Sequence, residues 1–473
     1  MADFDPTLVA EIVRRVITEL NHSTGAAAGT TGVTNGIFAT VDQAFAAAEK
    51  AQKIWHAMPR ADKAKVIAAL RQTMHDHAEE FARRAQQETG MGRVEDKIAK
   101  HHNAADATPG LEDLEVRSWS GDKGLVVEEY APYGVIAAIT PSTHPIPVLL
   151  NSSIIMIAPG NAVIFNVHPA AKNVSAYAME IFNRTIVDNG GPANLISMLR
   201  EPTMEGANEL FHHPQIRLIA ATGGPGLVKA AFAAGKKVVA AGPGNPPVVV
   251  DVTADLDRAA REIIKGASFD NNILCIAEKE VFVVDGVFDR FMQAMANAGA
   301  VRLNAAQIEM LTAKAFGKND KGQVFVSRDL IGKNANVLAA IAGLTLPDQV
   351  RILYGETDKN HLFVQEEQMM PFLPIVRCPS VEKAIEWSVE AEHGFGHTAM
   401  IYSNHLETIT RFTRAIDTDI VVVNGPSGAG NGGYSGEGYF SHTIASPTGE
   451  GICTPRDFAR VRRLAIYENL QVV

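Results

Sequence analysis

The sequence predicts an α/β protein with parallel sheets, because short β-rich segments alternate with helical segments over most of its length. The alternation begins near residue 135 and continues to about residue 402. At 473 residues the chain is too long for one ordinary hydrophobic core. We therefore expect two α/β lobes with a cleft between them.

The first twenty residues predict a helix that stands apart from these lobes. Asp5 is a suitable N-cap, Pro6 fits the first helical position, and apolar residues then recur at helical spacing as far as Leu20. The following segment, 21–36, is small, polar and glycine-rich, and is typical of a flexible linker. An amphipathic helix on a linker is either a docking peptide for another protein or an extension of the first lobe.

The first lobe is expected over 37–247. Two alanine-rich amphipathic helical segments open it, and a strand-like stretch over 124–139 follows. Strands and helices then alternate, which predicts βαβ units. The predicted strands are VIAAIT, AVIFNV, LISML, IRLIAAT and KVVAAG, and the predicted helices are IPVLLNSSIIMIAP, KNVSAYAMEIFNRTIVDN and GLVKAAFAAGK.

The second lobe is expected over 248–430, where the same rhythm returns. Its predicted strands are VVVDV, EVFVV, ILYG, LPIVRC and HTAMIYS, and its predicted helices are ADLDRAAREIIKGASF, FDRFMQAMANAG and VEKAIEWSVEAE. The glycine-rich NGPSGAGNGG is either a mobile loop over the cleft or a plain connector. The last segment, 431–473, returns toward the first lobe and ends in RVRRLAIYENLQVV, whose alternation fits a strand in an oligomer interface.

Composition and charge argue against several classes of function. With 43 basic and 53 acidic residues the formal net charge is −10, which disfavours a nucleic-acid partner or a broad membrane-binding surface. No apolar run is long enough to span a membrane, and the start of the chain does not resemble a secretion signal. Three scattered cysteines fit neither a disulfide framework nor a metal site, and the histidine pairs lack a third ligand. These features predict an intracellular protein without a bound metal.

Cys275 is the leading candidate for catalysis. It lies in FDNNILCIAEKE, about thirty residues after the glycine-rich AGPGNPPVVVD. Polar residues on both sides, from Asp270 to Asn272 and from Glu278 to Glu280, place the thiol at a junction between polar and apolar sequence. Cys275 is either a nucleophile beside a cofactor loop or a buried cysteine that acts as a small hydrophobe.

Three predicted strand ends carry residues suited to binding a dinucleotide in the cleft. Gly223 and Gly224 follow IRLIAAT and precede a helix, where backbone N–H groups can approach a pyrophosphate. The other two strand ends carry Pro141, Ser142, Thr143, Asn166 and His168. In QEEQMMPFLP, the acidic pair Glu366 and Glu367 precedes a predicted strand. This pair either provides a carboxylate that accepts hydrogen bonds from ribose hydroxyls or only solvates a loop.

Taken together, these motifs resemble the aldehyde dehydrogenase superfamily, and within it the CoA-acylating aldehyde dehydrogenases of bacterial microcompartments. The resemblance covers essentially all of 1–473, and its most specific stretches are ATGGPGLVKAA, AGPGNPPVVVD, SFDNNILCIAEKE, EEQMMPFLP and GHTAM. It implies a Rossmann-type cofactor lobe and an α/β catalytic lobe. It also implies a β extension for oligomerisation, which would take in part of 118–133 and the C-terminal strand.

The resemblance assigns roles to the candidate residues. Cys275 would be the nucleophile that accepts the acyl group. Gly223 and Gly224 would form the turn under the cofactor pyrophosphate, and Glu367 would hold the nicotinamide ribose. The wall near the nicotinamide would be formed by Thr140, Pro141, Ser142 and Thr143. Asn166 would stand near the adenosine ribose, and His168, at the same strand end, is a further candidate for cofactor binding.

Departures from the hydrolytic members of the superfamily are informative. Those enzymes carry Glu-Leu-Gly-Gly-Lys where this chain has Ala241 to Asn245, so the glutamate that would activate water is missing. Thr143 replaces an oxyanion-site asparagine, Asn166 replaces a lysine near the adenosine ribose, and His144 replaces the asparagine expected in the acylating subgroup. The missing glutamate is not needed when the CoA thiol attacks the thioester, because a thiol with a pKa of roughly 8.5 is already partly ionised near neutral pH.

The resemblance therefore implies CoA-dependent oxidation of a short-chain aldehyde, propionaldehyde or acetaldehyde, to its acyl-CoA with reduction of NAD. The N-terminal helix, residues 5–20, would dock the enzyme to a microcompartment shell protein, placing it in the microcompartment lumen within the cytoplasm. A homodimer or homotetramer is expected. The alternatives are a non-acylating dehydrogenase that releases the free acid, a Cys-dependent acyltransferase or hydrolase, and a catalytically silent scaffold.

Overall fold

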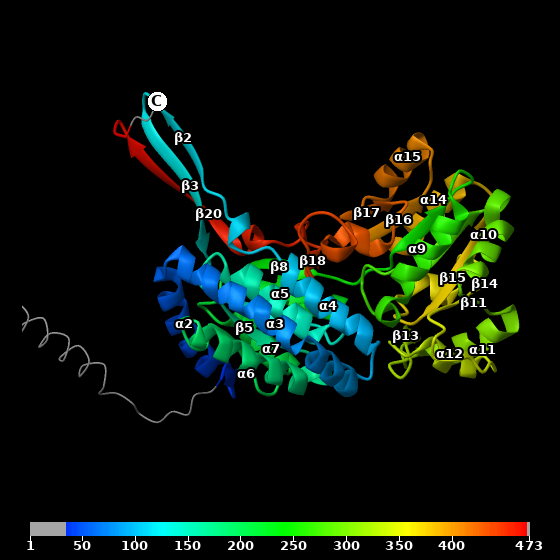
Figure 1. Ribbon diagram of the computed structural model, residues 1–473, viewed down its shortest axis with the longest axis horizontal. Coiled ribbons are helices and arrows are strands. Elements are labelled where there is room, and N and C mark those ends of the chain that lie inside the picture. Colours follow the sequence, from blue (N-terminus) through cyan, green and yellow to red (C-terminus); the bar gives the residue numbers. More distant parts are fainter. Residues whose placement is uncertain (1–34, 471–473) are drawn as a thin grey trace, which may run out of the picture. The chain divides into compact units, whose positions relative to one another are not determined.

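The computed structural model describes residues 35–470 and contains two large parallel β-sheets (Figure 1). The strands of the first sheet are β1 (Ile37–Phe38), β4 (Val135–Ile139), β5 (Ala162–Asn166), β6 (Ile196–Leu199), β7 (Leu218–Thr222) and β8 (Lys237–Ala241). Their order is β1-β6-β5-β4-β7-β8, and all pairs are parallel. Every residue of β4 and β5 is buried, as expected for a parallel sheet covered on both faces.

The helices of this lobe cover both faces of the sheet. They are α2 (Val41–Ala57), α3 (Arg60–Thr89), α4 (Val94–Ala107), α5 (Pro145–Ile157), α6 (Lys172–Asp188), α7 (Met204–His212) and α8 (Pro225–Ala233). The chain runs from β4 through β5 to β6 and then returns to β7 on the other side of β4. Right-handed crossovers therefore place α5 and α6 on one face and α7 and α8 on the other. Such sheets bind ligands at this reversal, beyond the carboxyl ends of the strands.

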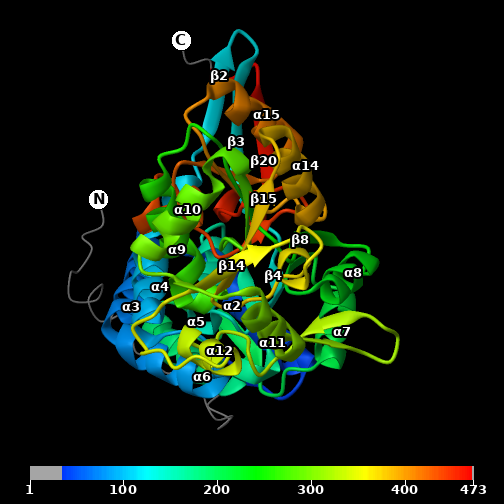
Figure 2. The same cartoon turned by 90° about the vertical axis from the view of Figure 1, so that its right-hand side faces the viewer.

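The second sheet has seven parallel strands. They are β9 (Pro247–Val250), β10 (Glu280–Val284), β11 (Val301–Arg302), β14 (Leu353–Thr357), β15 (Phe372–Cys378), β16 (Thr398–Tyr402) and β17 (Ile420–Val423), in the order β11-β14-β15-β10-β9-β16-β17. The helices α9 (Leu256–Ser268) and α10 (Asp285–Asn297) lie on one face (Figure 2). On the opposite face lie α14 (Val381–Glu392) and α15 (Leu406–Ile416).

Smaller elements complete this lobe. They are α11 (Ala305–Ala315), the hairpin β12 (Phe316–Lys318) and β13 (Val324–Val326), α12 (Ala335–Ile341) and α13 (Leu362–Gln365). The pair β18 (Ile444–Ala445) and β19 (Gly451–Ile452) lies on the return segment, where β18 contacts β8 of the first lobe. The core of the second lobe is continuous from the sheet to its helices, with Phe282, Phe288 and Phe291 fully buried.

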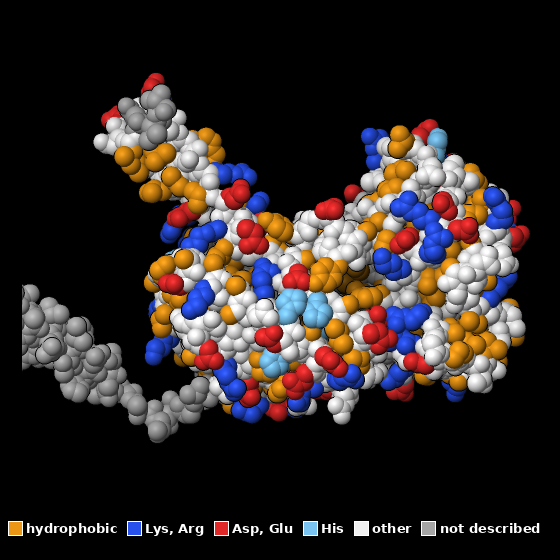
Figure 3. Space-filling view, in the orientation of Figure 1, with side chains coloured by type: hydrophobic (Ala, Val, Ile, Leu, Met, Phe, Trp, Pro, Cys, Tyr) orange, Lys and Arg blue, Asp and Glu red, His pale blue; other side chains and the backbone are white. Residues whose placement is uncertain are grey.

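The antiparallel strands β2 (Arg117–Gly121), β3 (Gly124–Pro132) and β20 (Ala459–Tyr467) form a separate three-stranded extension that projects from the first lobe (Figure 1). Large apolar side chains lie exposed on it, among them Trp119, Val461 and Leu464, and Figure 3 shows apolar atoms gathered along this extension. The predicted C-terminal strand is therefore confirmed. Its apolar surface is of the kind that a second subunit covers.

The structure confirms the predicted α/β class and each strand and helix that the sequence predicts within the described range. Several elements went unpredicted, among them the helices α7, α11, α12 and α15, the strands β2 and β17, and the β12–β13 hairpin. The predicted helix over 1–20 and most of the linker lie outside the described residues, and the domain division stays a prediction. In the part of the chain from 35 to 470, no helix is both long and apolar enough to cross a membrane.

Candidate active site

The two parallel sheets face each other through their strand ends, and a cavity of about 710 Å³ lies there. The first sheet contributes loops beyond the carboxyl ends of its strands, whereas the second contributes segments that precede the amino ends of β10 and β15. The cavity is lined by every site residue predicted from the sequence: Thr140, Pro141, Ser142, Thr143, Asn166, His168, Gly223, Gly224, Cys275 and Glu367. The fold thus brings together residues that lie far apart in the chain.

The turn between β7 and α8 is suited to an anionic group. Gly224 is the N-cap of α8 and Pro225 occupies the first turn, and no side chain caps the helix. Pro225 has no N–H and the Leu227 N–H bonds the Gly224 carbonyl oxygen at 3.0 Å, so the N–H groups of Gly224 and Gly226 are the ones left for a ligand, at a helix end whose dipole favours negative charge. A Cβ at position 223 would lie 2.8 Å from Leu227 Cδ2, so glycine allows this tight turn to pack on the helix.

Cys275 lies on a turn between α9 and β10 whose backbone is unusual. Three consecutive residues, Asp270, Asn271 and Asn272, have φ values of 47°, 57° and 66°. Non-glycine residues rarely adopt this left-handed conformation, and runs of it are costly unless the surroundings enforce them. The chain therefore needs strong local interactions to present the cysteine.

Two buried side chains close the turn around Cys275. Asn272 donates from Nδ2 to the carbonyl oxygens of Ala267, at 2.8 Å, and Glu278, at 2.9 Å. Lys279 donates from Nζ to the carbonyl oxygens of Asn272, at 2.8 Å, and Leu274, at 3.0 Å. Polar sequence alone would suggest that the residues on either side of the cysteine are exposed. They are instead buried and form a hydrogen-bond network.

Asp270 ties the same turn to the first lobe. Its carboxylate accepts hydrogen bonds from the backbone N–H of Arg93, at 2.8 Å, and from Lys97 Nζ, at 3.0 Å, and it pairs with Lys100. Burial alone would raise the pKa of Asp270, but Lys100 and Lys97 hold it below its usual value. Helix α4 therefore positions the segment that leads to Cys275 through a buried, ionised cluster.

The thiol of Cys275 is neutral in the ligand-free protein. Burial and the nearby Glu367 carboxylate raise its pKa to about 12, although Lys279 acts in the opposite direction. Burial also raises the pKa of Glu367 to about 7, opposed by Lys279 and by a hydrogen bond from the backbone of Gly244. A reaction at this thiol therefore requires something that stabilises the thiolate.

The segment after β8 passes close under the cysteine without supplying a carboxylate. Gly242 and Pro243 line the cavity, and Ala241 is buried at the end of β8. A Cβ at position 244 would lie 2.7 Å from the Cys275 carbonyl oxygen, so this close approach requires glycine. Among the described residues that line the cavity, Glu367 is the single carboxylate.

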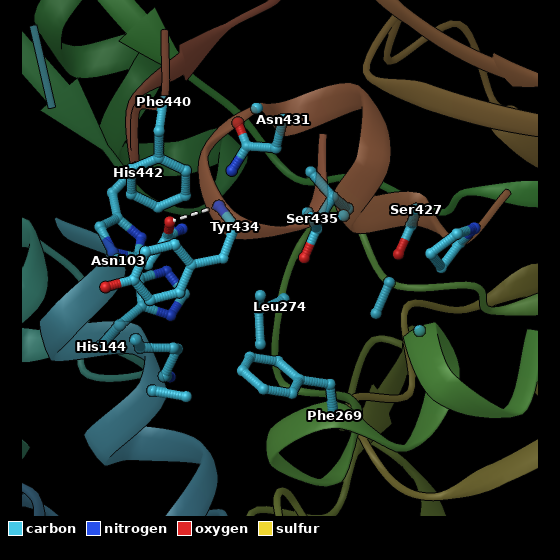
Figure 4. A pocket seen from close by; sticks show the side chains of 18 of the residues that line it. Asn103, His144, Phe269, Leu274, Ser427, Asn431, Tyr434, Ser435, Phe440 and His442 are labelled. Carbon is cyan, nitrogen blue, oxygen red and sulfur yellow. Dashed lines mark hydrogen bonds between the residues drawn. The ribbon is translucent and has the colours of Figure 1, made fainter. Parts of the chain in front are cut away.

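A second, smaller cavity of about 180 Å³ lies on the other side of the Cys275 turn (Figure 4). Leu274 and Ile276, the two neighbours of Cys275, line it together with Phe269 and Phe440. The thiol thus stands on the turn that separates a large cavity from a small, mostly apolar one.

The walls of this small cavity come from segments that sequence reasoning did not assign to the site. They are α4, the loop over 426–435 and the segment over 440–444. The glycine-rich tract NGPSGAGNGG is therefore part of a cavity wall. Glu278, next to the turn, accepts hydrogen bonds from the Ser427 backbone N–H at 2.8 Å and from its hydroxyl at 2.9 Å, which anchors this wall.

His144 lines both cavities. Its ring stacks on His442 with centroids 5.1 Å apart, and Figure 4 shows the two rings side by side at one end of the small cavity. Burial, and after it the charge of Lys100, lowers the pKa of both histidines well below its usual value. Both rings are therefore neutral at pH 7, and they add an uncharged wall to the small cavity.

The fold places a cysteine beside a large cavity at the strand ends of a parallel sheet, and the comparisons show the family to which this arrangement belongs. The model of the aldehyde dehydrogenase family matches residues 12–311, so the chain belongs to the aldehyde dehydrogenase family. Over 467 residues it is 45% identical to the acetaldehyde dehydrogenase (acetylating) EutE of Salmonella typhimurium, covering 98% of this chain and 99% of that protein.

Solved structures show the same relationship. A propionaldehyde dehydrogenase from the fucose utilisation bacterial microcompartment of Clostridium phytofermentans is 42% identical, with a TM-score of 0.89 over 93% of this chain and 100% of that chain. A propionaldehyde dehydrogenase of Rhodopseudomonas palustris, solved with bound CoA and an acylated cysteine, is 40% identical, with a TM-score of 0.90 over 93% and 100% of the two chains. The second of these structures thus holds both CoA and an acyl group on cysteine.

Proposed function

We propose that this protein oxidises a short-chain aldehyde, propionaldehyde or acetaldehyde, to its acyl-CoA and reduces NAD. The observation that carries the proposal is the position of Cys275, on the turn between the nucleotide-sized cavity and the small apolar one. The thiolate of Cys275 attacks the aldehyde carbonyl and forms a thiohemiacetal. Loss of hydride then leaves a thioester on the same sulfur, and the CoA thiol takes the acyl group.

NAD, when bound, accepts the hydride, and its positively charged ring favours the Cys275 thiolate. The residues of the large cavity fit such a cofactor. Gly223 and Gly224 are proposed to bind the pyrophosphate and Glu367 the nicotinamide ribose. Asn166 and His168 are proposed to bind the adenosine end, and the nicotinamide wall is assigned to Thr140, Pro141, Ser142 and Thr143.

The small cavity is proposed to hold the aldehyde chain. Its volume of about 180 Å³ is well below that of ordinary cofactor sites, roughly 300–1,000 Å³, but leaves room for two or three carbons. Leu274, Ile276 and Phe269 offer an apolar surface to the alkyl group. The aldehyde would thus approach the sulfur from one side and the nucleotide from the other.

CoA is proposed to enter through the same large cavity as NAD. Of the two cavities beside the Cys275 turn, only the larger, which Cys275 itself lines, has the size of a nucleotide site, at about 710 Å³. The reduced cofactor must then leave before CoA can reach the thioester. This order predicts ping-pong kinetics, with the acylated enzyme as the stable intermediate.

The preference for CoA over water follows from the segment 241–245. A water molecule needs a general base to attack a thioester efficiently, whereas the CoA thiol is already partly ionised near neutral pH. Ala241 supplies no base, and Glu367 serves the cofactor in this proposal. The thioester therefore persists until CoA arrives.

The direct test mixes purified protein with propanal and NAD and follows NADH absorbance with CoA present or omitted. Sustained NADH formation that requires CoA is expected, with at most one turnover per active site without it. Cys275→Ala should abolish turnover, whereas the matched variant Cys378→Ala, at a buried cysteine in β15, should retain it.

The alternatives predict different results in the same assay. Sustained NADH formation without CoA would indicate a dehydrogenase that releases the free acid. A Cys-dependent acyltransferase or hydrolase, or a silent scaffold, would form no NADH under either condition.

We further propose that residues 5–20 dock the enzyme to a shell protein in the lumen of a cytoplasmic bacterial microcompartment. The support is the amphipathic pattern of that segment and the microcompartment origin of the Clostridium phytofermentans relative. The exposed apolar side chains of the three-stranded extension support a homodimer or homotetramer. The proposed domains are 37–247 for the dinucleotide, 248–430 for catalysis, and 431–473 as the return and oligomerisation segment.

A further inference from the structure

One end of the large cavity carries positive charge from the opposite lobe. Arg328, which follows β13, lines the cavity together with His168, which follows β5. In the described range, no hydrogen bond or ion pair holds the Arg328 side chain, which is exposed. The two residues are close enough that the charge of Arg328, after burial, lowers the pKa of His168.

The described lining of the cavity holds one carboxylate, Glu367, whose charge acts on Cys275. No carboxylate contributes to the pKa of His168, on which burial and Arg328 act. Sites restricted to NAD normally place an Asp or Glu on the ribose hydroxyls at the adenosine end, where it would repel a phosphate. Here an arginine stands at the cavity wall instead, and arginine binds phosphate strongly through charge-assisted hydrogen bonds.

Two neighbouring groups complete the recognition of a ribose phosphate. Asn166 donates from Nδ2 to the Thr203 carbonyl oxygen at 3.0 Å, and its buried Oδ1 has no partner within the described residues. That oxygen can accept a hydrogen bond from a ribose hydroxyl. His168 Nδ1 accepts from the Ala170 backbone N–H at 3.1 Å, so the neutral ring carries its proton on Nε2, as a donor.

We propose that Arg328 and His168 bind a phosphomonoester on the ribose of an adenine nucleotide. The inference rests on the proposed function, in which one cavity takes NAD and CoA in turn. These two ligands share the ADP moiety, but only CoA carries a phosphate on the adenosine ribose. The 2′-phosphate of NADP offers the same chemistry at the neighbouring oxygen. Arg328 therefore strengthens the binding of CoA, and of NADP when NADP is the oxidant, without contributing to the binding of NAD.

The test compares ligands that differ only by this phosphate. Dissociation constants of CoA, dephospho-CoA, NAD and NADP are measured by calorimetry on the full-length protein, together with KM values in the NADH or NADPH assay. Arg328→Ala should raise the dissociation constant of CoA about tenfold, because one charge-assisted contact is lost. The dissociation constants of dephospho-CoA and NAD should stay within about twofold of the wild-type values. Raising the salt concentration should reduce the difference between CoA and dephospho-CoA in the wild type.

Matched variants separate the site from general charge effects. Lys321→Ala removes one positive charge from the turn of the same hairpin, but Lys321 does not line the cavity, so CoA affinity should stay unchanged. His168→Asn keeps an acceptor for the Ala170 N–H while removing the Nε2–H donor, and should weaken CoA by about threefold.

A loss of affinity in Arg328→Ala that is confined to CoA, or to NADP, supports the site and identifies which phosphate it binds. Equal weakening of CoA and dephospho-CoA by Arg328→Ala, or no change in any ligand, overturns the proposal. If the wild type binds CoA more tightly than dephospho-CoA yet forms no NADH from propanal, the proposed function fails while the phosphate site stands.

Discussion

The charge of Glu367 provides a quantitative test of the environment around the nucleophile. With a pKa of about 12, roughly one Cys275 thiol in ten thousand is ionised at pH 8, against about a quarter of ordinary thiols with a pKa of roughly 8.5. Glu367, with a pKa of about 7, is mostly ionised at that pH. Glu367→Gln removes this negative charge, and the pKa of Cys275 should therefore fall, by about one unit for a nearby charge.

The expected rate change is smaller than the change in ionisation. A fall of about one unit raises the thiolate fraction about tenfold, but each thiolate becomes about threefold less nucleophilic, because nucleophilicity falls as the pKa falls. The net gain at pH 8 is therefore about threefold. Below about pH 7 Glu367 becomes protonated in the wild type, so the advantage of the variant should shrink there.

The assay follows the reaction of the ligand-free protein with 4,4′-dithiodipyridine, a neutral disulfide, and assigns the modified residue by peptide mass spectrometry. Glu366→Gln is the matched control, because Glu366 adjoins Glu367 but does not line the cavity. Its rate should equal that of the wild type. A Glu367→Gln rate equal to or below that of the wild type at pH 8 would refute the proposed electrostatic control of Cys275.

Two further predictions concern the buried cluster at Asp270 and the stability of the thioester. Asp270→Asn leaves Lys97 and Lys100 without their buried counter-charge, so chemical denaturation should show a loss of about 3–5 kcal/mol. Asp289→Asn, in an exposed pair with Arg377, should cost about 1 kcal/mol or less, and equal losses for the two variants would refute the role of the buried cluster. Ala241→Glu places a carboxylate at the end of β8, and the ratio of released propionate to propionyl-CoA should rise, as measured by chromatography of the products. An unchanged ratio in a folded, active variant would show that a missing base is not what protects the thioester.

Much of the fold was predictable because its strands are short apolar runs separated by helical periodicity. The unpredicted helices lack that contrast. In α15, for example, only Thr408, Phe412 and Ile416 are buried, within a threonine-rich and charged segment. The start of α11 did carry a readable signal, the capping box of Asn304 and Gln307.

The candidate site divides in the same way. The residues that the first lobe contributes to the large cavity follow strand ends, where ligand-binding loops are expected, and Cys275 stands out by its sequence motif. The small cavity was not predictable, because α4, the loop over 426–435 and the segment over 440–444 meet only in the folded chain. The ionised cluster at Asp270 was hidden for a related reason. Charged residues usually indicate exposure, and only the packing of α4 against the turn shows that Lys97 and Lys100 are buried with it.

The most direct measurement is the identity of the residue that carries the acyl group. The protein is incubated with propanal and NAD without CoA, quenched in acid, digested and analysed by peptide mass spectrometry. One propionyl group on the peptide that contains Cys275 is expected, and it should disappear when CoA is added before the quench. NADH formation accompanied by a propionyl group on another residue, or on none, would contradict the account.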